Sequence, residues 1–246
     1  MSSPDAPPRI SIVIPVYNEE PLLRAAAVDL RERLAPLGWR YEVILAENGS
    51  RDGTVAEARA LCDRYPEFTT FSMGEPNYGR ALRQGILRAR GELVICDEID
   101  LCDTDFHAAA VALLDAGGVD FVVGSKLLAG SRDERPWARH AASLLYNGLL
   151  RAMLGFRGTD THGLKAFRRA VVGPLAEQCL VDRDVFASEL VIRADRAGVR
   201  SVEIPVRVIE KRTPSVDLTR RVPAVVRQLG RLTWAIRVRG PGRGRA

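Results

Sequence analysis

The first half of the chain alternates short apolar runs with longer stretches in which apolar residues recur every three or four positions. Short continuous apolar runs are typical of buried strands, and the second pattern is typical of helices that bury one side. The predicted strands are 10–16, 41–46, 68–73, 92–96 and 119–124, and the helices between them are 21–34, 54–65, 78–89 and 105–116.

Strands this apolar, separated by helices, predict an α/β fold in which helices cover both faces of a mostly parallel sheet. In such a sheet, ligands bind beyond the carboxyl ends of the strands. Polar clusters at 17–20, 47–53 and 97–105 each follow a predicted strand. We therefore expect the three clusters to contribute to one site.

The pattern changes after residue 125. Pro205 lacks a backbone donor, so the strand that contains it is predicted at an edge of the sheet. Between 222 and 236, apolar residues fall on one helical face and arginines on the other, which predicts a basic amphipathic helix. The remaining predicted elements are a polar loop at 125–136, a helix at 137–154, a turn-rich connection at 159–169, a helix at 184–197 and a strand at 200–208.

These patterns divide the chain into a flexible N-terminus (1–9), one α/β domain (10–210), the amphipathic helix (211–239) and a disordered tail (240–246). Hydrophobic residues make up 46% of the 246 residues and charged residues 27%. That balance is typical of a globular protein and excludes a disordered chain or a coiled coil.

Several functional classes can be set aside. Aromatic residues are only 6%, which disfavours a base-stacking surface. No apolar run approaches the about 18 residues of a membrane span, and the N-terminus lacks the apolar stretch of a signal peptide, so we expect a cytoplasmic protein. The four cysteines form no Cys-x-x-Cys pair, which excludes a zinc ribbon and favours reduced thiols.

The net charge of +5 is unevenly distributed. Residues 207–246 hold eleven basic and two acidic residues, which leaves 25 basic and 29 acidic residues in the rest of the chain. A basic terminal segment suggests an anionic partner, either a nucleic acid or an anionic membrane surface. The net-acidic body and the lack of a recognition motif disfavour nucleic acid.

Four motifs in order carry a family resemblance: IVIPVYNEE at 12–20, ENGSRDGT at 47–54, NYGRALRQGI at 77–86, and the acidic cluster after the fourth strand. Together they resemble family 2 glycosyltransferases of the GT-A fold, which is Rossmann-like. The similarity is greatest to the branch of dolichyl-phosphate mannose synthase and bacterial polyprenyl-phosphate sugar transferases. The resemblance covers roughly residues 10–210 as a pattern.

The resemblance implies a divalent cation, Mg²⁺ or Mn²⁺, held by acidic residues that match the family's Asp-x-Asp-Leu motif. Counting from Gly91, the match is Glu98-Ile99-Asp100-Leu101, so Glu98 and Asp100 are the implied metal-binding and catalytic acids. Such a cation stabilises the charge that grows on a departing diphosphate. Cys102 stands where the family often has Gln, and Asp97 or Asp103 could supply an oxygen instead. The alternative is a solvated acidic turn, with Asp103 or Thr104 capping the next helix.

The resemblance also implies a nucleotide pocket built from the first two motifs. The glycines of these motifs also fit plain turn chemistry. For Arg80 the two interpretations are a diphosphate contact and a solvated helix residue. The implied nucleotide-sugar-binding residues are Pro15, Tyr17, Glu19, Glu47, Asn48, Arg80 and Asp97.

In the polyprenyl-phosphate branch, basic residues bind the phosphate of the acceptor. The matching residues here are Lys126 of Gly-Ser-Lys, Arg139 and Ser143 one turn apart on the next helix, and Arg212 after the late strand. His162 replaces part of a branch motif, and it belongs either to the acceptor loop or to the core. Each basic residue alone could be surface charge, but together they predict an anion pocket.

A phosphate monoester is an ionised nucleophile and needs no general base, whereas a hydroxyl acceptor needs one. Glu189 or Asp184 could be that base, or Glu189 could hold the acceptor loop.

We therefore expect an inverting transfer from a nucleoside-diphosphate sugar (GDP-mannose or a UDP-hexose) to a polyprenyl monophosphate. The enzyme would lie at the inner face of the membrane, contacting anionic lipids through the C-terminal helix unless that helix docks on the body. The alternatives are a soluble hydroxyl acceptor and an inactive nucleotide-sugar-binding protein.

Overall fold

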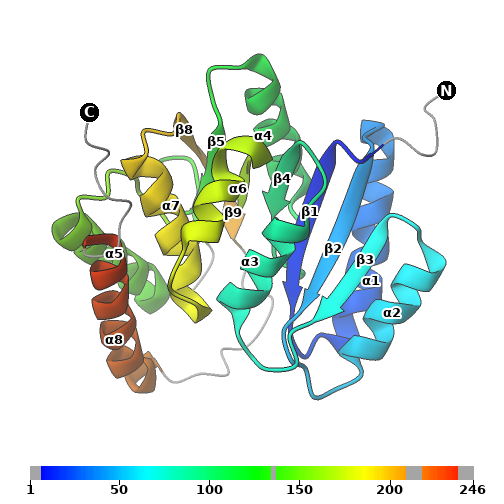
Figure 1. Cartoon of the computed structure of the whole chain (residues 1–246), viewed down its shortest axis with the longest axis horizontal. Coiled ribbons are helices and arrows are strands. Elements are labelled where there is room, and N and C mark those ends of the chain that lie inside the picture. Colours follow the sequence, from blue (N-terminus) through cyan, green and yellow to red (C-terminus); the bar gives the residue numbers. More distant parts are fainter. Residues whose placement is uncertain (1–6, 134–136, 209–217, 238–246) are drawn as a thin grey trace.

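The computed structural model describes residues 7–133, 137–208 and 218–237. A seven-stranded sheet forms its centre, in the order β3-β2-β1-β4-β7-β5-β8 (Figure 1). Every neighbouring pair is parallel except those of β7, which runs antiparallel to both β4 and β5. The strands are β1 (Ile10–Val16), β2 (Tyr41–Glu47), β3 (Phe68–Ser72), β4 (Leu93–Cys96), β5 (Phe121–Ser125), β7 (Lys165–Arg168) and β8 (Ser201–Pro205).

Helices cover both faces of this sheet because alternate strand residues bury toward opposite sides. In β1, Ile12 and Ile14 join the core under α1 (Glu20–Leu34), α2 (Thr54–Arg64) and α4 (Thr104–Ala116). Val13 joins the core on the other face. The second core packs under α3 (Tyr78–Arg88), α5 (Trp137–Leu154), α6 (Arg169–Gln178), α7 (Phe186–Arg196) and α8 (Leu218–Arg237).

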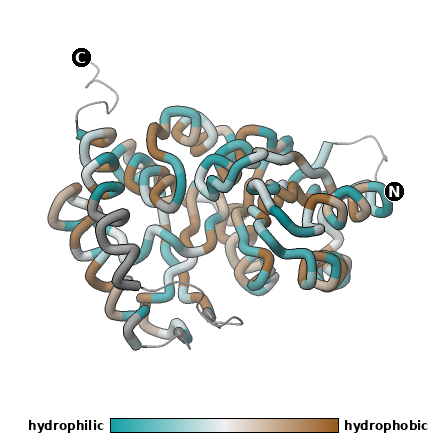
Figure 2. Tube along the Cα trace, turned by 90° about the horizontal axis from the view of Figure 1, so that it is seen from below, coloured by the Kyte–Doolittle hydropathy of each residue, from teal (hydrophilic) through white to brown (hydrophobic). Residues whose placement is uncertain are grey.

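The remaining elements are short. Two 3₁₀ turns, η1 (Ala35–Leu37) and η2 (Arg183–Val185), follow α1 and precede α7. The strands β6 (Arg132–Asp133) and β9 (Arg207–Val208) pair in parallel, apart from the main sheet. The carboxyl ends of β1, β2 and β3 share one edge, which Figure 2 views from below.

The predicted mostly parallel α/β fold is confirmed, and so is the edge position of the strand containing Pro205. The expected connection at 159–169 was wrong in part, because it contains β7, and α6 after it was not predicted. The strand β7 has only four residues and begins with a buried lysine, which hides its apolar character. Pro174 and Gly173 inside α6 weaken its helical signal.

The described part of α8 docks on the body. Leu229, Leu232 and Ile236 are buried in the same core as α5 and α7, while Arg227 and Arg231 are exposed. No helix in the described parts of the chain is long and apolar enough to cross a membrane. Residues 1–6 of the predicted N-terminal segment and the whole predicted tail, 240–246, lie outside the described residues.

We expect Leu232→Ala to lower the free energy of unfolding by about 2–5 kcal/mol, because the fully buried side chain would leave a cavity between α8 and the body. Leu145→Ala, on an exposed helix face, is the matched control and should change it by about 0.5 kcal/mol or less. Denaturant titration measures both. Equal, small effects would contradict docking of α8 on the body.

Candidate functional site

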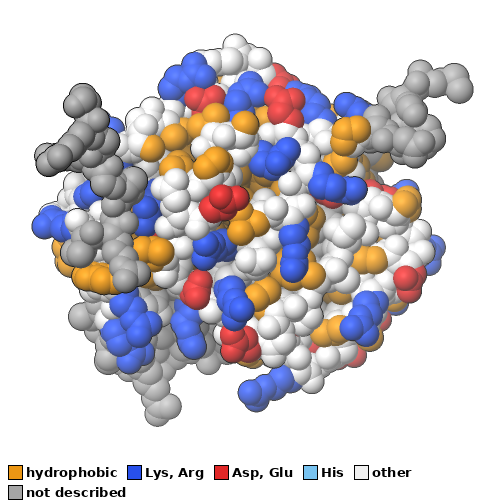
Figure 3. All heavy atoms as spheres, in the orientation of Figure 1, with side chains coloured by type: hydrophobic (Ala, Val, Ile, Leu, Met, Phe, Trp, Pro, Cys, Tyr) orange, Lys and Arg blue, Asp and Glu red, His pale blue; other side chains and the backbone are white. Residues whose placement is uncertain are grey.

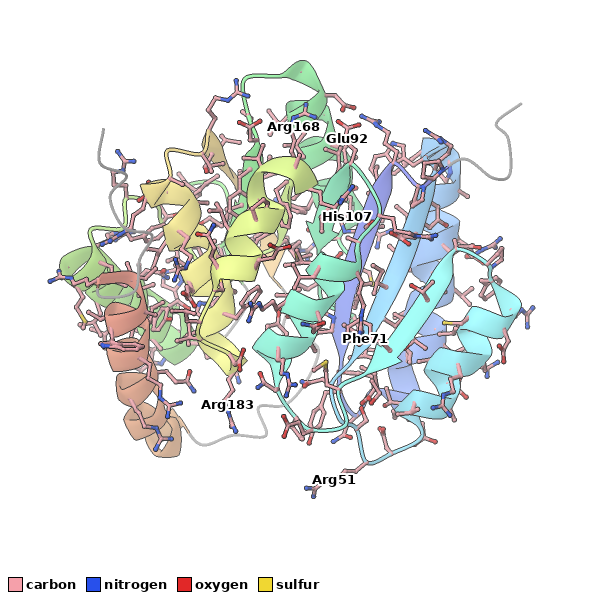
Figure 4. The ribbon with its side chains drawn as sticks, in the orientation of Figure 1. Arg51, Phe71, Glu92, His107, Arg168 and Arg183 are labelled. Carbon is pink, nitrogen blue, oxygen red and sulfur yellow. The ribbon has the colours of Figure 1, made fainter. Side chains whose placement is uncertain are left out.

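The reversed direction of β7 builds the site. Its first residue, Lys165, lies opposite Cys96 at the end of β4 and Val123 near the end of β5. The segment before β7 therefore meets the segments that follow β4 and β5 at one edge of the sheet. Arg168, at the other end of β7, pairs with Glu92 at the opposite edge (Figure 4).

A cavity of about 170 Å³ opens where these segments meet. Its charged lining comes from four places: the loop after β4, the end of β5, the segment before β7, and β9. The lining residues that carry charge or can titrate are Glu98, Lys126, Asp160, His162 and Arg207.

The acidic loop presents two of its four carboxylates to this region. Glu98 is exposed toward the cavity and Asp100 is partly exposed. The protein around Glu98 reduces its contact with water, and Asp100 and Asp97 add negative charge, so the pKa of Glu98 rises to about 7. The cost of gathering negative charge here would fall if a cation were bound.

The other candidate ligands of this loop have structural partners. The carboxylate of Asp103 caps α4 by accepting the backbone N–H groups of Asp105 (3.1 Å) and Phe106 (3.0 Å). Cys102 is buried, with its thiol directed to the carbonyl of Ile99. Asp97 is buried and accepts hydrogen bonds within the protein.

Glu98 and Asp100 fit a divalent cation chemically, since carboxylate oxygens are the ligands that Mg²⁺ and Mn²⁺ prefer. Within the described ranges, no group of three or more His, Cys, Asp or Glu side chains could hold a metal. A cation at these two acids would need further oxygens, and a bound diphosphate can supply them.

The second predicted nucleotide motif holds the loops after β2 and β3 together. Glu47 is buried and accepts hydrogen bonds from the backbone N–H of Ser50 and the hydroxyl of Ser72. The side-chain oxygen of Asn48 accepts from the backbone N–H of Asn77. These hydrogen bonds fix the loops after β2 and β3 at the edge of the sheet where the carboxyl ends of the parallel strands lie.

Gly49 is required where these loops meet. Its φ is +71°, and a Cβ there would come within 2.4 Å of the Glu75 backbone. Pro15 is buried at the end of β1, and Tyr17 after it is exposed. The backbone N–H of Glu19 donates to the hydroxyl of Thr54 at 2.7 Å, so the first motif is tied to α2.

Arg80 lies in the first turn of α3 and forms an ion pair with Glu75 at 2.7 Å. This half-exposed pair matches the solvated-helix interpretation.

In the lining of the same cavity, the ammonium of Lys126 donates to the carboxylate of Asp160 at 2.6 Å. Both side chains are buried or nearly so. Burial opposes ionisation of Asp160, but the charge and hydrogen bond of Lys126, with the backbone N–H of His162, outweigh it and lower the pKa of Asp160. Glu203 of β8 supports this segment by accepting from the backbone and hydroxyl of Thr159, both at 2.7 Å.

Two basic residues at the site were not among the predicted ones. Lys165 is buried and donates to the carbonyl of Gly163 at 2.6 Å, and burial lowers the pKa of its ammonium. Arg207 lines the cavity from β9. The site thus holds two of the three lysines of the chain, and this scarcity was the one sequence signal that could have singled out Lys165.

The helix α5 reaches the site through Tyr146, whose ring centroid lies 5.0 Å from that of His162. His162 also lines the cavity, as its assignment to the acceptor loop predicts. Arg139 and Ser143 lie on the same helical face as Tyr146, one to two turns earlier, and the hydroxyl of Ser143 donates to the carbonyl of Arg139 at 3.0 Å. Arg212 lies outside the described residues.

Glu189 is fully buried in α7 and away from bulk water. One carboxylate oxygen accepts the backbone N–H groups of Leu180 and Val181. The other accepts from Nε of Arg193 at 2.8 Å and forms an ion pair with the same guanidinium. Glu189 thus holds the segment between α6 and η2, and none of these contacts reaches the predicted acceptor loop at 159–169. The side chain of Asp184, the other candidate base, lies outside the described part of the structure.

Comparisons with known proteins agree with this arrangement. The model of the family "Glycosyl transferase family 2" matches residues 11–173. Glycosyltransferase AglD of Haloferax volcanii is 31% identical over 94% of this chain. An undecaprenyl-phosphate 4-deoxy-4-formamido-L-arabinose transferase of Edwardsiella ictaluri is 29% identical over 82%. The chain spans only 38% and 60% of the lengths of these two relatives.

Solved structures share the fold. Glucosyl-3-phosphoglycerate synthase of Mycobacterium tuberculosis, determined with Mn²⁺, UDP and its glucosylated product, matches 93% of this chain and 79% of its own, with a TM-score of 0.64 and 21% identity. The mannosyltransferase PcManGT of Pyrobaculum calidifontis, with GDP-mannose and Mn²⁺, matches 85% of this chain and 59% of its own, with a TM-score of 0.54 and 24% identity. The predicted GT-A-like fold is thereby confirmed.

We expect Lys126→Met to lower the free energy of unfolding at pH 7 by about 3–5 kcal/mol, because it leaves the buried Asp160 carboxylate without its ion-pair partner. The lowered pKa of Asp160 stabilises the wild type above the unfolded pKa of about 3.9, and this contribution is lost as the pH falls through the folded pKa. The difference in the free energy of unfolding between the variant and the wild type should therefore become smaller in acid.

Denaturant titrations at pH 7 and in acid measure this difference. Arg24→Met, which breaks the exposed pair with Glu57, is the control and should have a much smaller effect at either pH. A Lys126→Met effect that does not change with pH would show that the ion pair does not control the ionisation of Asp160.

Proposed function

Because the chain belongs to glycosyl transferase family 2, we propose that it transfers a sugar from a nucleoside-diphosphate sugar to a polyprenyl monophosphate. The observation that carries the proposal is one cavity whose lining holds both an acid, Glu98, and two basic residues, Lys126 and Arg207. A donor whose diphosphate needs a cation suits the acid, and an anionic acceptor suits the basic residues. One of the two relatives above supports a lipid-phosphate acceptor, since its name specifies undecaprenyl phosphate.

On the donor side, Glu98 and Asp100 would hold Mg²⁺ or Mn²⁺. The cation would supply electrostatic stabilisation of the diphosphate as it leaves. The loops fixed by Glu47 and Asn48 would form the wall against the nucleoside, together with Pro15, Tyr17 and Glu19. Their hydrogen bonds make this wall rigid before the donor binds, which lowers the entropic cost of binding.

On the acceptor side, Lys126 would hold the phosphate, with Arg139, Ser143 and Arg212 at the approach to the cavity. Lys126 has donors left for a ligand, because its ammonium has three and only one is directed to Asp160. A phosphate oxygen would attack the anomeric carbon from the face opposite the diphosphate. The bond from that carbon to the diphosphate breaks as the new bond forms, so the configuration inverts.

No general base is required in this reaction. The second pKa of a phosphate monoester is about 6, so its oxygen carries negative charge near neutral pH. The buried contacts of Glu189 agree with this, since both of its oxygens already accept hydrogen bonds from the protein. Lys126 and Arg207 would orient the nucleophile.

The test is turnover with a panel of GDP- and UDP-sugars and Mn²⁺, with and without polyprenyl phosphate, followed by mass spectrometry. We expect a glycosyl-phosphoprenol from one donor, and Asp100→Asn should reduce its rate about 100-fold or more, because a catalytic cation contributes several kcal/mol. Sugar transfer to a soluble hydroxyl compound alone, or no product from any donor, would contradict the proposal.

We also propose that the protein contacts an anionic membrane surface, with α5 as the apolar element. In the described part of α8, Leu229, Leu232 and Ile236 are buried, Trp234 is 49% exposed, and Arg227 and Arg231 face outward beside α5. On α5, Trp137 is 82% exposed and Leu145 67% exposed. In Figure 3, hydrophobic side chains gather at the left of the molecule, where α5 lies in Figure 1.

A bilayer is the occupant that this surface fits, because an apolar helix face bordered by arginines is the pattern of helices that lie at anionic interfaces. The placement is also coherent with a lipid acceptor. Tyr146 of the same helix contacts His162, so the apolar face and the cavity lie on either side of α5. Peripheral attachment at the cytoplasmic face would follow.

We expect Leu145→Glu to weaken binding to phosphatidylglycerol-containing vesicles about tenfold, because it removes one side chain from the bilayer. Leu87→Glu, at an exposed leucine of α3, is the control and should leave binding unchanged. Vesicle sedimentation measures both. If Leu145→Glu instead converts a dimer to a monomer and leaves vesicle binding unchanged, the surface joins two copies of the chain.

A further inference from the structure

A buried acid–histidine pair lies directly behind the acidic loop. His107, on the first turns of α4, is fully buried, and its Nε2 lies 2.5 Å from Oδ2 of Asp97 (Figure 4). Asp97 is the residue before Glu98 and was predicted to contact the nucleotide. The structure directs its carboxylate into the protein instead.

The Asp97 carboxylate joins the two ends of the acidic loop. Its Oδ1 accepts the backbone N–H of Glu98 at 2.6 Å, and its Oδ2 accepts that of Asp103 at 3.1 Å. Between these two anchors lie Glu98 and Asp100, the acids that would hold the cation. The position of the Asp97 carboxylate therefore determines how the loop closes.

His107 is placed to fix that carboxylate. The two side chains share a hydrogen bond, and the His107 tautomer with its proton on Nε2 donates it to the Asp97 carboxylate. The Nδ1 of His107 is buried and has no hydrogen-bond partner. With its proton on Nε2, the ring makes one side-chain hydrogen bond, and that bond goes to Asp97.

We propose that His107 is a positioning residue for the cation site, acting through Asp97 on Glu98 and Asp100. It touches neither donor nor acceptor. A partner behind a ligand orients that ligand and reduces the reorganisation needed on metal binding. The inference rests on the proposed function only in its assumption that Glu98 and Asp100 bind a divalent cation.

The test compares His107→Gln with His107→Asn. The amide nitrogen of Gln can take the place of Nε2 and donate to Asp97, whereas the shorter Asn cannot reach it. Mn²⁺ affinity is measured by the loss of the free-ion electron paramagnetic resonance signal in the presence of a nucleoside diphosphate, relative to the same nucleotide without protein, and without acceptor. We expect His107→Asn to bind Mn²⁺ about tenfold more weakly than the wild type and His107→Gln to stay close to it.

Ser11→Ala is the matched structural control. It removes another buried hydrogen bond, the 2.6 Å contact to Glu42, on the neighbouring strands β1 and β2. It should lower the unfolding temperature without changing Mn²⁺ affinity. If His107→Asn behaves in the same way, His107 is structural only and the inference is overturned. A wild type that binds no Mn²⁺ would overturn the metal site itself, and with it this inference.

Discussion

The direction of one short strand determines the site. Because β7 runs against its neighbours, it starts at the edge where β4 and β5 end, and the loops at that edge must converge. An all-parallel sheet would place the start of β7, and Lys165 with it, at the far edge. Gly163 shows how tight the convergence is, since a Cβ there would clash with the carbonyl oxygen of Gly124.

The charged pairs at this edge of the sheet contribute more to positioning functional groups than to the net stability of the fold. A buried ion pair such as Lys126–Asp160 contributes little net stability over an apolar pair, but losing one partner is costly. The pair therefore holds Lys126 at a defined place in the cavity. Asp97 and His107 form a second buried pair, which holds the two ends of the acidic loop. Lys126 and the acidic loop, which would meet the substrates, are thus both held by buried contacts.

The strands and the loops that follow them could be predicted, because both depend on local apolar patterns and on the common edge of a parallel sheet. The inward direction of Asp97 and Glu47 could not be predicted, because it depends on partners such as His107 and Ser72, which are distant along the chain or on other elements. Arg207 was missed for the same reason, since β9 lies outside the main sheet and, among the described residues, pairs with β6 alone. The strand β7 was not predicted, because its four residues begin with lysine and are too few to show the apolar pattern of a strand.

We expect a donor-side cation and an acceptor phosphate to bind in one cavity, the cation at Glu98 and Asp100 and the phosphate at Lys126. Anomalous diffraction from crystals grown with Mn²⁺, a nucleoside diphosphate and inorganic phosphate locates both directly. The account predicts Mn²⁺ on the carboxylates of Glu98 and Asp100, and phosphate within hydrogen-bond distance of the Lys126 ammonium. Mn²⁺ bound away from the acidic loop, or phosphate held only outside the cavity, would contradict it.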